Sequence, residues 1–185
     1  MRIISGKFRG KKLQGPRHAD LRPTSDRLKE SLFNILGPDV QGASVLDAFA
    51  GTGAIGLEAL SRGAREVVFI ESSRDAVRLI RKNLELCAVT SAYQILQEDV
   101  FTSMRTLART GFRADIAFLD PPYHWGPYCD LIGTLFHTGI VSAGSRVILE
   151  HHSKAAVPES ETGFRCVRTL RQSDKCLSFY LAERE

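Results

Sequence analysis

The sequence predicts an α/β fold built on a mostly parallel sheet, and three observations support this. From residue 44 to residue 150, short apolar runs alternate with segments whose apolar residues recur at helical spacing. This is the pattern of a parallel sheet covered by helices. A glycine-rich turn, 51–56, joins the first apolar run to the first helical segment. After Pro158 two strand-like runs follow with no helix between them, so we expect an antiparallel hairpin closing one sheet edge.

Each expected element has its own pattern in the chain. Apolar and β-branched runs predict parallel strands at 44–48, 66–71, 93–96, 114–119 and 145–150, and the final hairpin at 164–170 and 176–181. Helical spacing predicts helices at 54–61, 75–87, 102–108 and 127–137. These helices fall between successive strands, as right-handed crossovers require.

The first forty residues have a different organisation. Glycines and alternating cations predict a short hairpin at 2–13, followed by a loop at 14–23. Pro23-Thr24-Ser25-Asp26 is a helix start signal, and Gly37-Pro38 ends that helix. We therefore divide the chain into an N-terminal basic hairpin and helix, 1–40, and a main α/β domain, 41–185.

Composition places the chain among globular proteins. It has 185 residues, of which 43% are hydrophobic and 25% charged. No run reaches the ~18–20 apolar residues that span a bilayer, and residues 1–7 lead into no apolar secretory core. We expect a soluble, cytoplasmic protein. The four cysteines lack C-x-x-C spacing, and no ligand cluster accompanies His151-His152, so no metal site is predicted.

Positive charge is concentrated at the N-terminus. Residues 1–30 hold nine Lys and Arg against three Asp and Glu, whereas the rest of the chain holds 16 basic and 18 acidic residues. Clustered cations attract polyanions and release counterions from phosphates. A solvated basic arm without a partner is the alternative. The candidate RNA-binding residues are Lys7, Arg9, Lys11, Lys12, Arg22 and Arg27.

The turn at Gly51, Gly53 and Gly56 matches the G-x-G-x-x-G fingerprint of nucleotide-binding folds, and Glu71 lies where such folds place a ribose-binding acid. A tight packing turn or a nicotinamide dinucleotide site are the alternatives. Asp47 at the end of the first strand opposes a diphosphate and favours an ammonium. We therefore expect S-adenosylmethionine as cofactor, with Asp99 either near its adenine or capping a helix.

The tetrapeptide Asp120-Pro121-Pro122-Tyr123 directly follows the fourth predicted strand. Prolines fix φ and carry no N–H, so this segment is a rigid row of hydrogen-bond acceptors. Acceptors suit a substrate that presents an amino group, and the Tyr123 ring can stack on a planar base. We expect these four residues to form the catalytic site of an amino-group methyltransferase.

Taken together, these residues resemble the class I S-adenosylmethionine-dependent methyltransferases, with 41–185 as the methyltransferase domain. More narrowly, they resemble the RsmD family of bacterial 16S rRNA guanine-N2 methyltransferases. The specific marks are Arg2-Ile3-Ile4-Ser5-Gly6 and the run from Arg22 to Asn34. The resemblance implies a Rossmann-like sheet, a guanine amino group held by Asp120 to Tyr123, and a flipped base that passes the Arg22–Glu30 segment. The implied cofactor-binding residues are Asp47, Phe49, Gly51, Thr52, Gly53, Glu71, Ser72, Asp99 and Val100.

Several points stay open at this stage. DNA or RNA adenine-N6 methylation and protein glutamine-N5 methylation share the Asp-Pro-Pro-Tyr segment, and a dead RNA-binding module is a further alternative. We expect the partner to be 16S rRNA, within a small ribosomal subunit or an assembly intermediate, and the chain to be a monomer. His124-Trp125 departs from the commonest family pattern, and Trp125 is a second stacking surface, a lid residue or a local packing anchor. Arg171 and Lys175 are expected on a solvated face.

Overall fold

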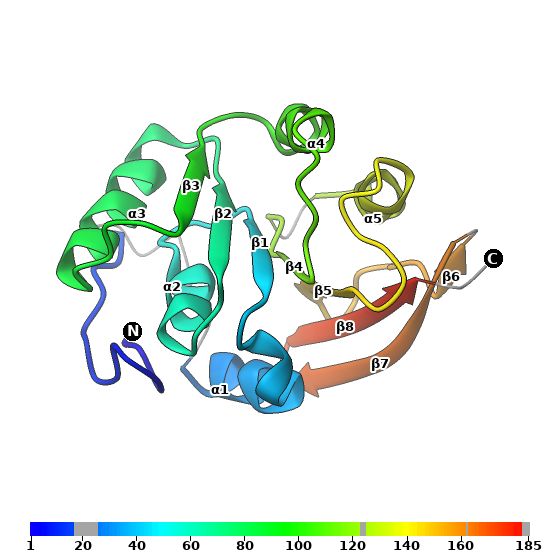
Figure 1. The fold of residues 1–185 in the computed structure, drawn as a ribbon. Helices are drawn as coiled ribbons and strands as arrows, with labels where there is room; N and C mark the ends of the chain where they lie inside the picture. The colour runs from blue at the N-terminus through cyan, green and yellow to red at the C-terminus, as the bar shows by residue number, and fades with distance from the viewer. Residues whose placement is uncertain (17–25, 123–124, 162, 183–185) are drawn as a thin grey trace.

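The computed structural model describes residues 1–16, 26–122, 125–161 and 163–182. Its elements run in the order α1 (Asp26–Leu36), η1 (Gly37–Val40, a 3-10 helix), β1 (Ser44–Ala48), α2 (Ala54–Ser61), β2 (Glu66–Ile70), α3 (Arg74–Leu86), β3 (Tyr93–Leu96), α4 (Val100–Arg109), β4 (Ile116–Leu119), α5 (Tyr128–His137), β5 (Arg146–His152), β6 (Ser160–Glu161), β7 (Phe164–Gln172) and β8 (Lys175–Ala182). Figure 1 shows the helices packed on both faces of a single sheet.

The sheet confirms the predicted fold class. Its strand order is β3-β2-β1-β4-β5-β8-β7-β6, and the first five strands in that order pair in parallel. β8 then pairs antiparallel with β5 and with β7. The final hairpin therefore lies at the sheet edge as predicted, with β8 inserted next to β5. The two-residue strand β6 was not predicted, because so short a segment carries no periodicity.

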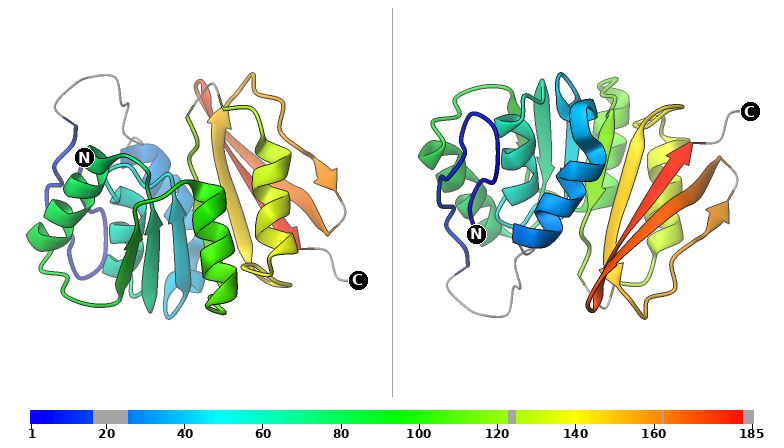
Figure 2. Two further views of the ribbon diagram at one scale, coloured as in Figure 1. Left: turned by 90° about the horizontal axis from the view of Figure 1, so that it is seen from above. Right: turned by 90° about the horizontal axis from the view of Figure 1, so that it is seen from below.

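Two hydrophobic clusters fill the space above and below the sheet. One joins α1 and α2 to strand side chains such as Val45, Phe118 and Ile148. The other joins α4 and α5 to side chains such as Leu46, Leu119 and Leu149. Side chains alternate between the faces along each strand. A polar strand residue two positions from a member of one cluster therefore lies on the same face as that cluster. Figure 2 shows α1 and α5 on opposite sides of the sheet.

The N-terminal hairpin is confirmed in its pairing but not as regular strands. The backbone N–H of Ile3 donates to the Lys11 carbonyl at 2.9 Å, and the N–H of Gly10 donates to the Ile3 carbonyl at 2.9 Å. Among the described residues of this segment, Arg2 and Lys12 form an isolated antiparallel bridge. We refer to residues 2–13 as the basic loop. Ile3 and Leu13 from this loop are buried in the same cluster as Val45; the division of the chain at residue 40 stays a prediction.

Gly6 fastens the basic loop to α2. A Cβ atom on Gly6 would lie 1.8 Å from the Ser61 carbonyl oxygen, and its φ is +81°. The loop can therefore approach α2 this closely only with glycine at this position. The neighbouring N–H groups use that proximity, since Lys7 N–H donates to the Ser61 carbonyl at 2.7 Å and Phe8 N–H donates to Ser61 Oγ at 2.9 Å.

Candidate active site

The candidate site lies where the order of the parallel strands reverses. β1 stands between β2 and β4. From β1 the chain crosses over to β2 and then β3 on one side, whereas from β4 it crosses over to β5 on the other side. Open α/β sheets bind ligands at the carboxyl ends of the strands at such a reversal. Asp47, Glu71 and Asp120 lie at the carboxyl ends of β1, β2 and β4 respectively. The fold therefore brings together three site residues that are far apart in the sequence.

The glycine turn from 49 to 56 has the conformation that a close backbone approach requires. Gly51 and Gly53 have φ of +55° and +74°, and the Gly53 N–H closes the turn on the Ala50 carbonyl at 2.7 Å. A Cβ on Gly56 would lie 2.3 Å from a Phe69 ring carbon, so this glycine allows α2 to pack on β2. Phe49 also has a positive φ, +60°, which for an aromatic residue is a strained conformation typical of functional turns.

Asp47 is buried beneath this turn. Asp47 is only 2% exposed, and its Oδ2 accepts a hydrogen bond from the Gly56 N–H at 2.8 Å. Burial raises the pKa of Asp47 to about 8, the Gly56 bond opposes that rise, and Glu71 adds to it. An approaching cation would favour the charged form of this carboxyl.

Glu71 supports the turn from the neighbouring strand. One carboxylate oxygen accepts the Gly51 N–H at 2.8 Å, and the other accepts the Ser73 N–H at 2.8 Å. A carboxylate has about four acceptor positions, so these two bonds leave capacity for hydroxyl donors. Ser72 is exposed beside it and Thr52 is half-buried. The assignment of Glu71 to a ribose stays a prediction.

Asp99 caps α4, as the helix-cap interpretation predicted. Its Oδ1 accepts the N–H groups of Phe101 at 3.0 Å and Thr102 at 3.2 Å. Asp99 itself is exposed, and the adjacent Val100 is buried. Capping leaves the second carboxylate oxygen for other donors, so contact with an adenine stays a prediction.

The segment after β4 forms a rigid acceptor turn. Asp120 N–H donates to the Ala48 carbonyl at 3.3 Å, and the Pro122 carbonyl accepts the Trp125 N–H at 2.8 Å. Pro121 is buried and Pro122 is exposed. Tyr123 and His124 lie outside the described residues. The Pro122 carbonyl is thus engaged within the turn, and the catalytic roles of Asp120, Pro121, Pro122 and Tyr123 stay predictions.

An aromatic cluster around Trp125 joins the glycine turn to the acceptor turn. The Trp125 ring lies 5.4 Å from Phe49, 6.0 Å from Phe101 and 5.9 Å from Tyr128, measured between centroids. Trp125 therefore packs among these three rings, and a stacking or lid role for it stays a prediction. Phe101 and Tyr128 were not singled out from the sequence. Only their positions, just after Asp99 and at the start of the fourth crossover helix, could have indicated them.

The prediction that Lys175 lies on a solvated face is wrong. Its ammonium group forms an ion pair with a carboxylate oxygen of Glu150, and the two side chains are 13% and 0% exposed. The reason is topological: β8 begins at the edge where the parallel strands end, and Lys175 is its first residue. Sequence periodicity does not show which strand becomes the neighbour of β5. Arg171, by contrast, is exposed as expected.

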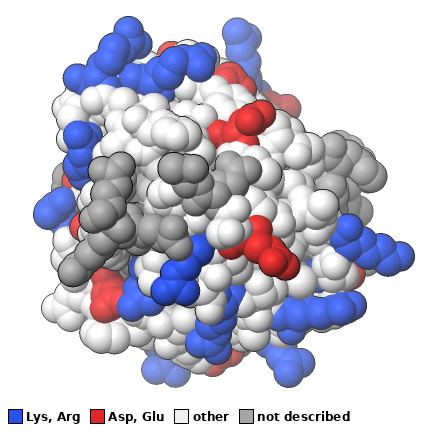
Figure 3. Space-filling model, turned by 90° about the vertical axis from the view of Figure 1, so that its right-hand side faces the viewer, with Lys and Arg blue, Asp and Glu red and all other residues white. Residues whose placement is uncertain are grey.

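The basic loop presents the predicted cations to solvent. Lys7, Arg9, Lys11 and Lys12 are exposed, as is Arg27 on α1, whereas Arg22 lies outside the described residues. Lys29 contributes to the basic count of this region but is buried, and its ammonium lies 3.1 Å from Glu58 Oε2. The face in Figure 3, on the β6–β8 side, has basic side chains mainly near its rim with acidic ones between them.

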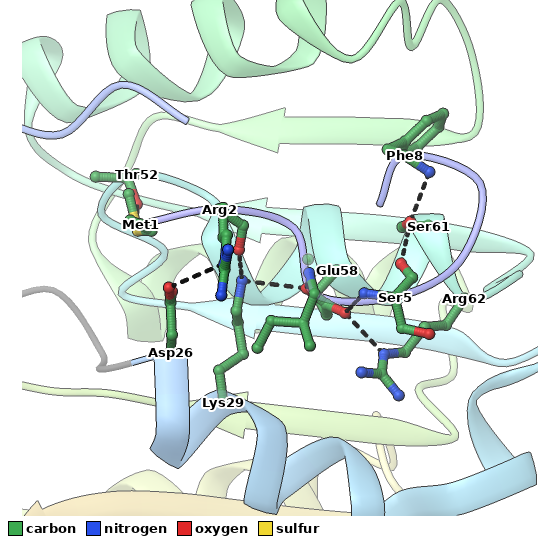
Figure 4. Close-up of polar contacts among 12 residues, drawn as sticks. Met1, Arg2, Ser5, Phe8, Asp26, Lys29, Thr52, Glu58, Ser61 and Arg62 are labelled. Carbon is green, nitrogen blue, oxygen red and sulfur yellow. Dashed lines mark hydrogen bonds and ion pairs between the residues drawn. The ribbon is translucent and has the colours of Figure 1, made fainter. Parts of the chain in front are cut away.

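Glu58 connects α2 to the basic loop and to α1. Its carboxylate accepts the N–H groups of Ile4 at 2.8 Å and Ser5 at 3.0 Å. It also pairs with Arg62 Nε at 2.8 Å. Figure 4 shows these bonds converging on Glu58 from three segments. A buried carboxylate with this many donors holds the basic loop against the helix that carries the glycine turn.

Asn83 on α3 forms a second connection, directly to the glycine turn. Its side-chain amide donates to the Thr52 carbonyl at 2.9 Å and to the Gln14 carbonyl at 3.0 Å. Its oxygen accepts the Gln14 N–H at 2.7 Å. The residue is fully buried. One side chain, which the sequence analysis did not single out, therefore holds both Gln14, directly after the basic loop, and the glycine turn.

Comparisons with known proteins identify the family of this chain. The family described as conserved hypothetical protein 95 matches residues 1–181. The chain belongs to this family. It is 37% identical over 158 residues to ribosomal RNA small subunit methyltransferase D of Escherichia coli K12, covering 85% of this chain and 78% of that protein. The predicted resemblance to the RsmD family is confirmed.

Solved structures confirm the fold. The hypothetical protein TTHA0928 of Thermus thermophilus superposes with a TM-score of 0.82 at 31% identity, covering 97% of this chain and 98% of that chain. A SAM dependent methyltransferase from Agrobacterium tumefaciens superposes with a TM-score of 0.65 at 18% identity, covering 94% of this chain and 66% of that chain. The second likeness shows the Rossmann-like fold alone. No helix within the described ranges is long and apolar enough to cross a membrane.

Proposed function

We propose that this chain transfers a methyl group from S-adenosylmethionine to the exocyclic N2 amino group of a guanine in small-subunit (16S) rRNA. The observation that carries the proposal is the acceptor turn at Asp120, placed beside the glycine turn at the strand reversal. The relative named ribosomal RNA small subunit methyltransferase D supports the rRNA substrate. The base and the atom that is methylated rest on the chemistry of the acceptor turn and on the family resemblance.

The residues present fit S-adenosylmethionine. Its methionine ammonium suits the buried Asp47 carboxyl, and its ribose hydroxyls suit Glu71, which has acceptor capacity beyond its two backbone bonds. The positive φ angles of Gly51 and Gly53 bring the backbone close to a ligand. When bound, this cofactor supplies an electrophilic methyl group on a sulfonium. A diphosphate fits less well, because its charge would not stabilise the ionised form of the buried Asp47 carboxyl and Glu71 would repel it.

The acceptor turn supplies what an aromatic amino group lacks. The nitrogen lone pair of such a group is delocalised into the ring, so the amine is a weak nucleophile. Asp120 and the Pro121 carbonyl would accept both amino protons, which favours a tetrahedral nitrogen and directs its lone pair outward. As the new N–C bond forms and the methyl–sulfur bond of the sulfonium breaks to leave a neutral thioether, the nitrogen would become positive and one of its protons must leave. The Asp120 carboxylate would stabilise that charge and accept the proton.

The exposed cations of the basic loop suit an RNA backbone. Lys7, Arg9, Lys11 and Lys12 reach solvent from the basic loop, which Glu58 fastens to α2. Gln14, the next residue after the loop, is bonded to Asn83, which also bonds the glycine turn at Thr52. Phosphate contacts position a nucleic acid without reading its sequence. We therefore assign the loop to binding the rRNA, within a small subunit or an assembly intermediate, by a monomeric enzyme.

The test is methyl transfer from labelled S-adenosylmethionine to three substrates: unmethylated small ribosomal subunits, free 16S rRNA and duplex DNA. Nucleoside analysis by mass spectrometry identifies the product. N2-methylguanosine from subunits or rRNA supports the proposal. N6-methyladenine in any substrate would replace it with the adenine alternative, and transfer to protein alone would replace it with the glutamine alternative.

A further inference from the structure

Three acidic side chains meet on one face at the carboxyl edge of the sheet. Asp47, Asp120 and Glu150 each lie two positions beyond a residue of the cluster under α1 and α2, namely Val45, Phe118 and Ile148. Because side chains alternate along a strand, the Asp47 and Glu150 carboxyl groups project to the α1–α2 face. Asp120, the residue directly after β4, keeps the ladder bond of its N–H to the Ala48 carbonyl and so continues the same alternation. Among the three only Asp120 belongs to the acceptor turn. The other two surround it from the neighbouring strands.

Strand pairing places Glu150 beside Asp120. Leu119 of β4 and Leu149 of β5 are partners in the parallel register, so the next residues along the two strands, Asp120 and Glu150, are neighbours. Adjacent strands lie ~4.8 Å apart. On neighbouring strands the Glu150 carboxylate disfavours the charged form of Asp120.

Lys175 enters this group from the antiparallel strand. β8 runs opposite to β5, and its first residue, Lys175, is the partner of His152 in the register. It lies two positions before Leu177, a member of the same cluster as Ile148. Its ammonium bonds to Glu150 Oε1 with both side chains nearly inaccessible to solvent. Screening by water is therefore weak at this pair.

The charged and titratable groups that act on Asp120 come from each element around it. Burial raises the pKa of Asp120 well above its usual range; Glu150 on β5 raises it further, Lys175 on β8 lowers it, and Asp47 on β1 raises it. Asp120 in turn acts on Tyr128 of α5: burial raises the pKa of the Tyr128 phenol, and Asp120 raises it further. Among the described residues acting on Asp120, Lys175 is the group that favours its ionised form.

We propose that Lys175 and Glu150 are positioning residues that set the charge of Asp120. Lys175 favours the carboxylate that accepts the substrate amino protons, and Glu150 both holds Lys175 at the site and limits its effect. This inference rests on the proposed function only for its consequence in catalysis. The charge relationship itself belongs to the protein without substrate and can be measured there.

The two residues act on Asp120 in opposite directions, which a merely structural role would not produce. Replacing Glu150 by Gln keeps the size and one acceptor for Lys175 but removes the negative charge, so ionised Asp120 becomes easier to form. Replacing Lys175 by Met removes the positive charge, so the ionised form of Asp120 becomes harder to form. Removing both in one protein cancels much of the change and avoids leaving a buried carboxylate without its cation.

The direct experiment follows the Asp120 carboxyl by NMR in protein labelled with ¹³C at aspartate side chains, with Asp120→Asn to assign the signal. Glu150→Gln should lower the titration midpoint of Asp120 by about one pH unit, and Lys175→Met should raise it by a similar amount. The double variant should fall between them. If Lys175→Met does not fold, the double variant compared with Glu150→Gln isolates the effect of Lys175. Lys154→Met, an exposed cation two residues after β5, is the matched control and should leave the midpoint unchanged.

The pH dependence of single-turnover methyl transfer is the second readout. Its rising limb should move down in Glu150→Gln and up in Lys175→Met, and should be absent in Asp120→Asn. Midpoints that move in the same direction, or do not move, overturn the inference. If the NMR midpoints shift as expected but wild-type protein methylates no rRNA, the proposed function fails while the charge relationship stands.

Discussion

The Asp47 carboxylate accepts the backbone N–H of Gly56 at 2.8 Å, across the glycine turn that follows β1. This bond joins the end of the first strand to the first turn of α2. It is also buried, and burial raises the pKa of Asp47 to about 8 even though the bond favours the charged form. A pKa raised this far favours the protonated carboxyl in the ligand-free protein at neutral pH. Binding of a cationic ligand should release that proton.

Proton release on cofactor binding is the first prediction. We expect a substantial fraction of one proton, approaching one, to leave the protein when S-adenosylmethionine binds at pH 7. Isothermal titration calorimetry in two buffers with different ionisation enthalpies measures this number. Asp47→Asn should bind more weakly and release no proton. Equal apparent enthalpies in both buffers for the wild-type protein would contradict the placement of Asp47 next to the ammonium.

The same carboxyl predicts how folding stability depends on pH. Its pKa is raised from 3.8 to about 8 in the folded protein, so between about pH 4 and pH 8 the folded state binds more protons than the unfolded state. Stability attributed to Asp47 therefore falls as pH rises through that window and levels off above it. Urea unfolding at pH 5 and pH 8 should show a smaller loss for Asp47→Asn than for wild type. Identical losses would show that Asp47 has an ordinary environment.

Loss of the Asp120 carboxyl should separate catalysis from cofactor binding. Asp120→Ala removes the group that accepts an amino proton and stabilises the charge on nitrogen, so we expect turnover to fall about 10²-fold or more. The dissociation constant for the cofactor should change by less than about threefold, because Asp47 and Glu71 are untouched. Single-turnover assays and calorimetry measure the two quantities. Retained turnover would refute the acceptor role.

Charge reversal in the basic loop should weaken RNA binding alone. Changing Lys7, Arg9, Lys11 and Lys12 to Glu removes exposed cations, so affinity for rRNA should fall and its salt dependence should become shallower. Cofactor affinity should stay the same. A matched pair tests the location: Lys11→Glu with Lys12→Glu should weaken binding more than Arg105→Glu with Arg109→Glu on α4, where both arginines are also exposed. Unchanged methylation by the fourfold variant would exclude this role for the loop.

Gly6 and Gly10 form a matched test of how the basic loop is fastened. Both have positive φ, +81° and +82°, but a Cβ on Gly6 would meet the Ser61 carbonyl at 1.8 Å, whereas one on Gly10 would meet nothing within 4 Å. Gly10→Ala should cost about 1 kcal/mol of stability from backbone strain alone. Gly6→Ala should cost roughly 1–3 kcal/mol more and should speed amide exchange at Lys7 and Phe8. Equal costs would show that the contact with Ser61 is not needed.

Much of the fold could be predicted because local signals agreed with it. The bounds of β1, α2 and β3 match the expected 44–48, 54–61 and 93–96, since each segment is punctuated by glycine or polar turn residues. The start of α4 was placed two residues late. Asp99 caps this helix, and its first turn carries no periodic signal that distinguishes helix from loop.

The catalytic candidates could be predicted, but their surroundings could not. Asp47, Glu71 and Asp120 follow strands in the sequence, so parallel pairing alone brings them to one edge. Lys175 was placed in solvent because a cation in a hairpin usually is exposed. Its burial depends on β8 lying next to β5 and on a partner 25 residues away. Asn83 and Glu58 likewise act through contacts across long sequence separations.

The most direct test of the central claim is the nucleoside made by wild-type protein and by Asp120→Ala on unmethylated small ribosomal subunits. With labelled S-adenosylmethionine, wild type should place one methyl group per subunit, recovered from the 16S rRNA as N2-methylguanosine, and Asp120→Ala should place almost none while still binding cofactor. Label recovered as any other nucleoside, or equal label from both proteins, would contradict the assignment of Asp120 to a guanine amino group.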